Sequence, residues 1–180
     1  MKKVTVETFE RAFKFCIDAH HGQKRKGDGR PYFLHPVDVV LILLDLKMNE
    51  KAYVLGSSML LHDTVEDCPE ISIEMIAKEF GYQIASIVDE LTNDPEEIER
   101  IGKTQYLCQK VLILSSYALT GKLGDRLSNV RSMGGLPEIK RKNYIEQTKQ
   151  IIQTLEEKRK LSGRQKKLIK MIKSEIKKHK

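Results

Sequence analysis

Apolar side chains recur at the spacing of an α-helix along most of the chain, and this periodicity restricts the fold to packed helices. In residues 9–20 the apolar face continues at i, i+3, i+4, i+7, i+8 and i+11. Apart from a possible small β-hairpin around residues 29–33, no segment has a convincing strand pattern, and no internal repeat is present. The sequence therefore predicts an all-α fold.

Prolines, glycines and capping residues divide the helical pattern into about eight to nine helices. Pro36 suits the first turn of a second helix, although "VDVVLILLDLK" also fits a buried strand by periodicity alone. A third helix is expected from about Asn49 into "HDTVED", ending before Pro69. Later helices are expected to begin at or near Ser72, Ile84, Asp94, Leu119, Pro137 and Gly163. This succession of short helices favours an orthogonal bundle.

The positive charge of the chain is concentrated at its C-terminal end. Residues 158–180 carry eleven Lys/Arg and one Glu, which gives this segment a net charge of +10. The whole chain carries +7, so the other 157 residues sum to −3. We therefore predict a main domain over 1–157 and a basic C-terminal helix over 158–180. Because the main domain is mildly acidic, nucleic acid is an unlikely partner. Apolar residues in the basic helix predict packing on the main domain or on a second subunit, as in a homo-oligomer: Leu168, Met171, Ile172 and Ile176.

The sequence also predicts a cytoplasmic protein without a membrane partner. Its longest apolar run, residues 39–44, is too short to cross a bilayer, and no signal-peptide core follows the basic first residues. The three cysteines, Cys16, Cys68 and Cys108, form no zinc-type pair and are expected to be reduced thiols.

An unusual concentration of charge follows the apolar residues of "LLHDTVEDC", residues 60–68. If this stretch ends a helix, Glu66 lies four residues after His62 and three after Asp63, on neighbouring faces. Three acids near a helix C-terminus oppose the helix dipole by about 0.3–1 kcal/mol each, and buried charges need a counter-charge or a metal. A divalent cation would resolve both conflicts. The alternative is an exposed acidic helix end with a chance histidine.

Two further stretches supply similar donors. "PYFLHP" places His35 at the start of the second helix, and "GKLGDRLSN" places Asp125 and Asn129 four residues apart, with Lys122 three before the aspartate. The alternatives are a capping or core histidine and a surface aspartate paired with Lys122 or Arg126. Two imidazoles and two carboxylates without a thiolate suit Mn²⁺, Fe²⁺, Zn²⁺ or Mg²⁺. The four candidate metal ligands are His35, His62, Asp63 and Asp125.

These motifs occur in the order found in a known family. "AHHGQKRK", "PYFLHP", "LLHDTVED" and "GKLGDRLSNVRSM", spread over roughly residues 5–150, resemble the hydrolase domain of the RelA/SpoT homologues within the HD superfamily. The similarity is strongest to the stand-alone small alarmone hydrolases, which include the metazoan SpoT homologue. It implies an HD-type helical bundle over 1–157 that hydrolyses the 3′-pyrophosphate of (p)ppGpp, yielding GDP or GTP and pyrophosphate. The implied cofactor is Mn²⁺, with Zn²⁺, Fe²⁺ or Mg²⁺ as alternatives.

The resemblance also implies roles for single residues. The four candidate ligands match the metal ligands of the family, and Glu66 and Asp67 match the acidic pair that orients or activates the attacking water. Fixed cations in the basic loop 24–30 would offset phosphoryl charge. The substrate-binding residues predicted on this basis are Arg25, Lys26, Lys122, Asn129, Ser132 and Tyr144.

The chain departs from the family pattern at two places. "KRKGDGRPY" is one residue longer than the common loop, and residues 98–118 match poorly. One alternative is an HD phosphohydrolase with another substrate, such as NADPH or a nucleoside phosphate. The other is a non-catalytic regulatory module that binds a nucleotide or RNA. The presence of every expected ligand and both acids argues against such a decayed site.

Overall fold

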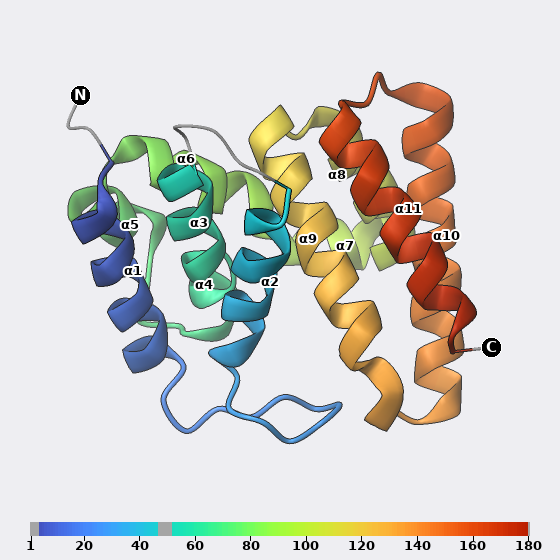
Figure 1. Ribbon diagram of the computed structural model, residues 1–180, viewed down its shortest axis with the longest axis horizontal. Helices are drawn as coiled ribbons and strands as arrows, with labels where there is room; N and C mark the ends of the chain where they lie inside the picture. The colour runs from blue at the N-terminus through green and yellow to red at the C-terminus, as the bar shows by residue number, and fades with distance from the viewer. Residues whose placement is uncertain (1–3, 47–51, 180) are drawn as a thin grey trace. The chain divides into compact units, whose positions relative to one another are not determined.

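The protein is all-α, as predicted. The computed structural model describes residues 4–46 and 52–179, and in these residues it contains eleven α-helices and one short 3₁₀-helix (Figure 1). The helices form two compact units, residues 1–25 with 29–92 and residues 26–28 with 93–180. The predicted division between 157 and 158 stays a prediction.

The first unit is built around one helix that is buried on every side. This helix, α3 (Ala52–Leu61), packs against α1, α2 and α6, and all its residues from Val54 onward are buried. A helix that is apolar all round needs such complete enclosure. The other helices of the unit are α1 (Val6–Ala19), α2 (Leu34–Leu44), α4 (Thr64–Asp67), α5 (Ile73–Phe80) and α6 (Tyr82–Leu91).

The structure confirms the helical interpretation of "VDVVLILLDLK", which lies mostly in α2, and corrects the third predicted helix. Its expected start at Asn49 falls outside the described residues, and its end is divided. The helix α3 stops at Leu61, His62 and Asp63 form a turn, and α4 follows. The Thr64 hydroxyl donates a 2.7 Å hydrogen bond to the Leu61 carbonyl, so a side chain binds a carbonyl at the end of α3.

The hairpin that the sequence suggested around 29–33 is reduced to a single antiparallel bridge between Lys24 and Pro31. The Arg25 amide donates to the Arg30 carbonyl at 2.9 Å, and Gly29 makes the turn with a φ of 70°. The Gly29 amide donates to the Arg25 carbonyl at 3.0 Å, so the chain turns directly after the bridge and the bridge stays isolated. This bridge fixes the loop that leads into α2.

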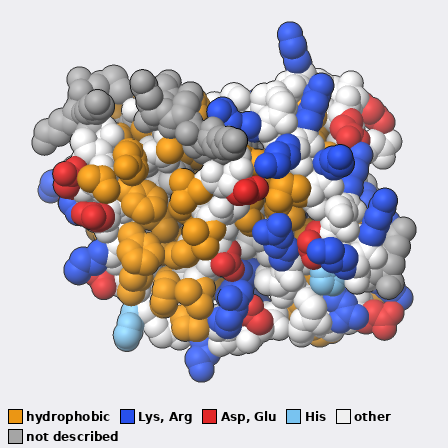
Figure 2. All heavy atoms as spheres, viewed as in Figure 1, with side chains coloured by type: hydrophobic (Ala, Val, Ile, Leu, Met, Phe, Trp, Pro, Cys, Tyr) orange, Lys and Arg blue, Asp and Glu red, His pale blue; other side chains and the backbone are white. Residues whose placement is uncertain are grey.

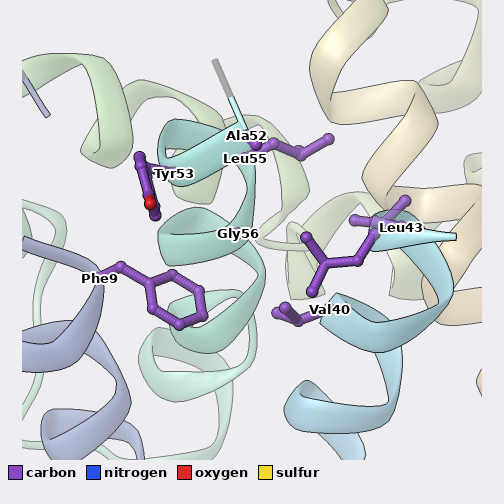
Figure 3. Close-up of a pocket in the computed structure, with 8 residues that line it drawn as sticks. Phe9, Val40, Leu43, Ala52, Tyr53, Leu55 and Gly56 are labelled. Carbon is purple, nitrogen blue, oxygen red and sulfur yellow. The ribbon is translucent and has the colours of Figure 1, made fainter. Parts of the chain in front are cut away.

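Close packing of α1 on α3 depends on Gly56. A methyl group at this position would lie 2.9 Å from the ring of Phe9. A hollow of about 120 Å³ remains beside this contact, with Phe9, Val40, Leu43 and Tyr53 in its lining (Figure 3). The lining is almost wholly apolar, so it offers no catalytic groups. Figure 2 shows apolar side chains gathered over α1, α2 and α3. The exposed apolar residues of these helices include Val6, Phe13, Leu41, Leu44 and Tyr53.

The second unit centres on α9 (Ser116–Ser132), which packs against α11 (Gly163–Lys177). The small residues of α9 that suggested tight packing, Gly121, Gly124 and Ser128, are all buried. The helix expected to start at Asp94 does so, with Asp94 as its N-cap, and it ends before Gly102, whose φ is 83°. The remaining elements are α7 (Pro95–Ile101), α8 (Lys103–Ile113), the 3₁₀-helix η1 (Met133–Gly135) and α10 (Glu138–Lys158).

The basic C-terminal segment is part of the second unit. Leu168 and Ile172 of its apolar stripe are fully buried in α11. The Arg159 guanidinium donates to the carbonyls of Val111 and Leu114, both at 2.5 Å, and thus binds the open carbonyls at the end of α8. The stripe therefore packs on the main domain, one of the two predicted alternatives, while oligomerisation through this helix stays a prediction.

Among the described residues, no helix is both long and apolar enough to cross a membrane. This agrees with the shortness of the apolar run at 39–44. The cytoplasmic location stays a prediction.

The start of α7 gives a test of helix capping. The Asp94 carboxylate accepts hydrogen bonds from the amides of Glu96 and Glu97 at 2.9 and 3.1 Å. We expect Asp94→Ala to lower the free energy of unfolding by about 0.5–2 kcal/mol, as measured by urea denaturation. Asp89→Ala, an exposed position within α6, is the control and should change it by less than about 0.5 kcal/mol. Equal effects of the two changes would contradict the capping role.

The cysteines should differ in reactivity. Burial, helped by the Asp63 and Cys68 side chains, raises the pKa of the Cys16 thiol to about 12, and burial also raises the pKa of Cys68. Cys108 is only partly buried. Near pH 8, a chromogenic disulfide reagent should therefore modify Cys108 first in the folded protein and all three thiols after unfolding. Cys108→Ser should remove the fast phase; a fast phase that persists in this variant would show the assignment to be wrong.

Candidate metal centre and substrate site

Three predicted ligands meet in the first unit. Donor atoms of His35, His62 and Asp63 all lie within 4.8 Å of one another. The Asp63 Oδ2 lies 3.1 Å from Nε2 of His62 and 3.6 Å from Nε2 of His35. Both histidines are buried, while the Asp63 side chain is 18% exposed. The cluster is thus nearly enclosed and open at the carboxylate.

The elements around the cluster aim these side chains. His62 and Asp63 follow directly on the fully buried Leu61, so the end of α3 anchors them in the core. His35 is the second residue of α2, and its backbone amide donates to the Tyr32 carbonyl at 2.8 Å. The apolar "LL" and the helix start therefore decide where the donors lie.

The hydrogen bonds of His62 define which ring nitrogen faces Asp63. Its Nδ1 lies 2.7 Å from the Met59 carbonyl, which can only accept, so Nδ1 carries the proton. In the neutral ring, Nε2 then presents a lone pair to the Asp63 carboxylate. Two acceptors face each other across 3.1 Å, and either a proton or a cation between them is required. A nitrogen–oxygen donor set of this kind fits a divalent metal.

The two predicted catalytic acids follow on α4. Glu66 and Asp67 are both exposed residues, and the Asp67 amide donates to the Asp63 carbonyl at 2.9 Å. Partial burial of its carboxyl group and the nearby Asp63 charge raise the pKa of Asp67, while a hydrogen bond from Tyr32 and the proximity of His20 oppose this rise. The break after α3 thus sets both acids on a separate short helix rather than continuing α3.

Tyr32 belongs to the site and was missed by the sequence analysis. Its hydroxyl donates a 2.8 Å hydrogen bond to Oδ2 of Asp63. The ring lies 4.8 Å from the ring of His20 and 5.9 Å from that of His35, measured between centroids. The available signal was its place in "PYFLHP", three residues before His35, where a helix start brings both side chains together.

Apart from Arg25, the other predicted site residues lie in the second unit, on α9 and beside it. Asp125 is buried; its Oδ1 accepts a 2.5 Å hydrogen bond from Asn129, and its Oδ2 lies 3.5 Å from the Lys122 ammonium. The pairing with Lys122 was one of the alternatives drawn from the sequence. The Ser132 hydroxyl donates to the Ser128 carbonyl at 3.0 Å, within the same helix.

Tyr144 of α10 joins this group through a buried arginine. The guanidinium of Arg126 lies 4.7 Å from the centre of the Tyr144 ring and donates to Gln147 at 3.0 Å. Burial raises the pKa of Tyr144 to about 12, with the Arg126 charge opposing the rise. The phenol is therefore a neutral hydrogen-bonding group at ordinary pH.

The basic loop is divided between the two units. Arg25 is buried in the first unit, whereas the exposed Lys26 belongs to the second together with Gly27 and Asp28. A methyl group at Gly27 would lie 2.6 Å from the carbonyl oxygen of Ser132. The glycine of this loop therefore allows its backbone to approach the end of α9, which brings Lys26 and Ser132 into one neighbourhood.

Comparison with known proteins identifies relatives in plants and bacteria. The chain is 34% identical over 163 residues to a putative chloroplastic GTP diphosphokinase of Arabidopsis thaliana, covering 83% of this chain and 18% of that protein. It is 34% identical over 154 residues to a guanosine-3′,5′-bis(diphosphate) 3′-pyrophosphohydrolase of Aquifex aeolicus, covering 81% and 20%. The chain therefore spans about a fifth of the length of these curated relatives.

A solved structure has the same fold. It is described as a metazoan ortholog of SpoT that hydrolyses ppGpp and plays a role in starvation responses. Its TM-score is 0.79 at 24% sequence identity, and the match covers 95% of this chain and 94% of that one. These findings confirm the resemblance that the motifs indicated. The HD domain family model matches residues 12–160, which include every predicted site residue, and the chain therefore belongs to the HD domain family.

Proposed function

We propose that the protein is a metal-dependent hydrolase that removes the 3′-pyrophosphate of ppGpp and pppGpp, releasing GDP or GTP. The observation that carries this proposal is the meeting of His35, His62 and Asp63 within 4.8 Å, directly before an acidic pair on α4. We propose these three residues as metal ligands, with Asp125 as the fourth on the strength of the motif order. Mn²⁺ is the proposed ion.

The donor set decides what the bound ion can do. A divalent cation, when bound, lowers the pKa of a coordinated water and polarises a phosphoryl oxygen. The chain's own residues must then handle the proton and the substrate. Glu66 and Asp67 are proposed to orient the water and accept its proton. The raised pKa of Asp67 makes this carboxylate the stronger base.

Cationic and neutral side chains are proposed to bind the nucleotide. Arg25 and Lys26 of the basic loop would offset the negative charge of the pyrophosphate. Asn129, Ser132 and Tyr144 supply neutral hydrogen-bonding groups, as nucleoside recognition requires. Lys122 is the remaining member of the proposed substrate-binding set.

The relatives support the choice of substrate. The Aquifex protein is named as a hydrolase of this nucleotide, and the structural neighbour is described as hydrolysing ppGpp. The similarity to the Aquifex protein covers 81% of this chain, and the HD domain model spans residues 12–160, which contain the histidine, aspartate and glutamate motifs. The proposal therefore assigns the relatives' reaction to a chain that carries the candidate metal ligands and the acidic pair.

The first test is hydrolysis of ppGpp. We expect pyrophosphate release with Mn²⁺, its loss after chelation with EDTA, and its recovery when Mn²⁺ is returned. A substrate panel including NADPH and nucleoside phosphates is the control for specificity. No release from ppGpp at micromolar enzyme would contradict the proposal, and a kcat/KM for NADPH far above that for ppGpp would reassign the substrate.

The second test removes one proposed ligand. His62→Ala should raise the Kd for Mn²⁺, measured by titration calorimetry, by more than the ~10–100-fold that loss of an outer partner costs. The exposed His21→Ala is the matched control and should leave the Kd unchanged. Circular dichroism of each variant checks that the fold is intact. Unaltered Mn²⁺ binding by a folded His62→Ala protein would rule out this ligand.

A further inference from the structure

Tyr32 donates its hydroxyl to the proposed ligand Asp63, and it links three parts of the first unit. Its amide donates to the Gln23 carbonyl at 2.9 Å, so the residue directly before the basic loop holds the Tyr32 backbone. Its own carbonyl accepts from the His35 amide at 2.8 Å, at the start of α2. Its side chain then reaches Asp63, beyond the end of α3.

The ring of Tyr32 has little freedom to leave this position. It packs against His20 on one side, and the edge of His35 approaches it at an interplanar angle of 71°. The buried His20 is itself held, because its Nδ1 lies 2.8 Å from Oε1 of Gln23. The Gln23 amide nitrogen in turn donates to the Asp67 carbonyl at 3.2 Å. Through His20 and Gln23, these contacts connect the Tyr32 ring to the backbone of Asp67.

The hydroxyl acts as a donor toward Asp63, because an ionised carboxylate can only accept hydrogen bonds. An ionised carboxylate accepts about four hydrogen bonds or ligand contacts. The Tyr32 hydroxyl meets Oδ2, the same oxygen that lies 3.1 Å from Nε2 of His62, so it acts directly on the atom that faces this imidazole.

We propose that Tyr32 is a positioning residue that holds the Asp63 carboxylate in the orientation needed to bind the metal and keeps the Asp67 segment beside it. This inference rests on the proposed metal site and adds a residue to it. Partners of this kind typically contribute 10–100-fold in metal affinity or activity, because they fix the ligand before the ion arrives. Asp63 also accepts a hydrogen bond from the Asp67 amide through its carbonyl, so loss of the hydroxyl should affect binding and turnover together.

The experiment compares Tyr32→Phe with wild type and with Tyr82→Phe. Phenylalanine keeps the ring between His20 and His35 and removes only the hydroxyl. Tyr82, at the start of α6, is 82% exposed and serves as the matched control. Free Mn²⁺ is measured by its electron paramagnetic resonance signal, and turnover of ppGpp is measured at saturating Mn²⁺, both well below the Tm of each protein.

We expect Tyr32→Phe to raise the Kd for Mn²⁺ about 10–100-fold and to lower kcat about tenfold at unchanged KM, with no change in Tyr82→Phe. A lower Tm with an unchanged Kd would make Tyr32 a purely structural residue. A higher KM with an unchanged Kd would make it a substrate contact. Either result overturns the proposal.

The wild-type titration separates this inference from the proposed function. Wild-type protein that binds Mn²⁺ without hydrolysing ppGpp would refute the proposed substrate, and the Kd comparison would still decide the role of Tyr32. Wild-type protein that hydrolyses ppGpp, with the same Kd in Tyr32→Phe, would refute only the role of Tyr32. Wild-type protein that binds no divalent cation would overturn both.

Discussion

The Asp63 carboxylate facing two buried imidazoles is the interaction on which the first unit depends. A carboxylate and two histidines withdrawn from water cost several kcal/mol unless their charges and lone pairs are balanced. The hydroxyl of Tyr32 and the carbonyl of Met59 contribute to this balance, and they also determine which atoms turn toward the centre. The cluster is therefore costly to bury and is oriented by specific contacts.

Rigid surroundings are what allow such a cluster to persist. The helix α3 is enclosed by α1, α2 and α6, and its buried residues continue up to the position before His62. Its buried Ser58 donates its hydroxyl to the Val54 carbonyl at 2.9 Å, so this polar side chain is satisfied locally. Close-packed interiors transmit small displacements, and hence packing errors far along α3 would shift the donors. The packing of α3 therefore determines where the donor atoms of His62 and Asp63 lie.

The sequence predicts the helices well where local signals and tertiary packing agree. Ser72 caps α5 through the Met75 amide, and Gly81 ends that helix, as expected from propensity alone. The break at His62 was not predictable, because "SSMLLHDTVED" has no proline or glycine before Pro69. It arises from the Thr64 hydroxyl and from the contacts of the cluster, which a linear pattern does not contain. Tyr32 was missed for the same reason, since its role depends on Asp63, 31 residues away.

The contacts of the buried Asp125 in the second unit differ from those of Asp63 in the first. Asp125 is buried next to the Lys122 ammonium and the Asn129 amide, so a cation of the chain already lies within 3.5 Å of it. In the first unit, Asp63 accepts a hydrogen bond from the Tyr32 hydroxyl and faces two imidazoles. Asp125 is therefore oriented by side chains of its own helix, whereas Asp63 is oriented by the Tyr32 hydroxyl, 31 residues earlier in the chain. The first arrangement follows from helical spacing alone, and the second requires the folded first unit.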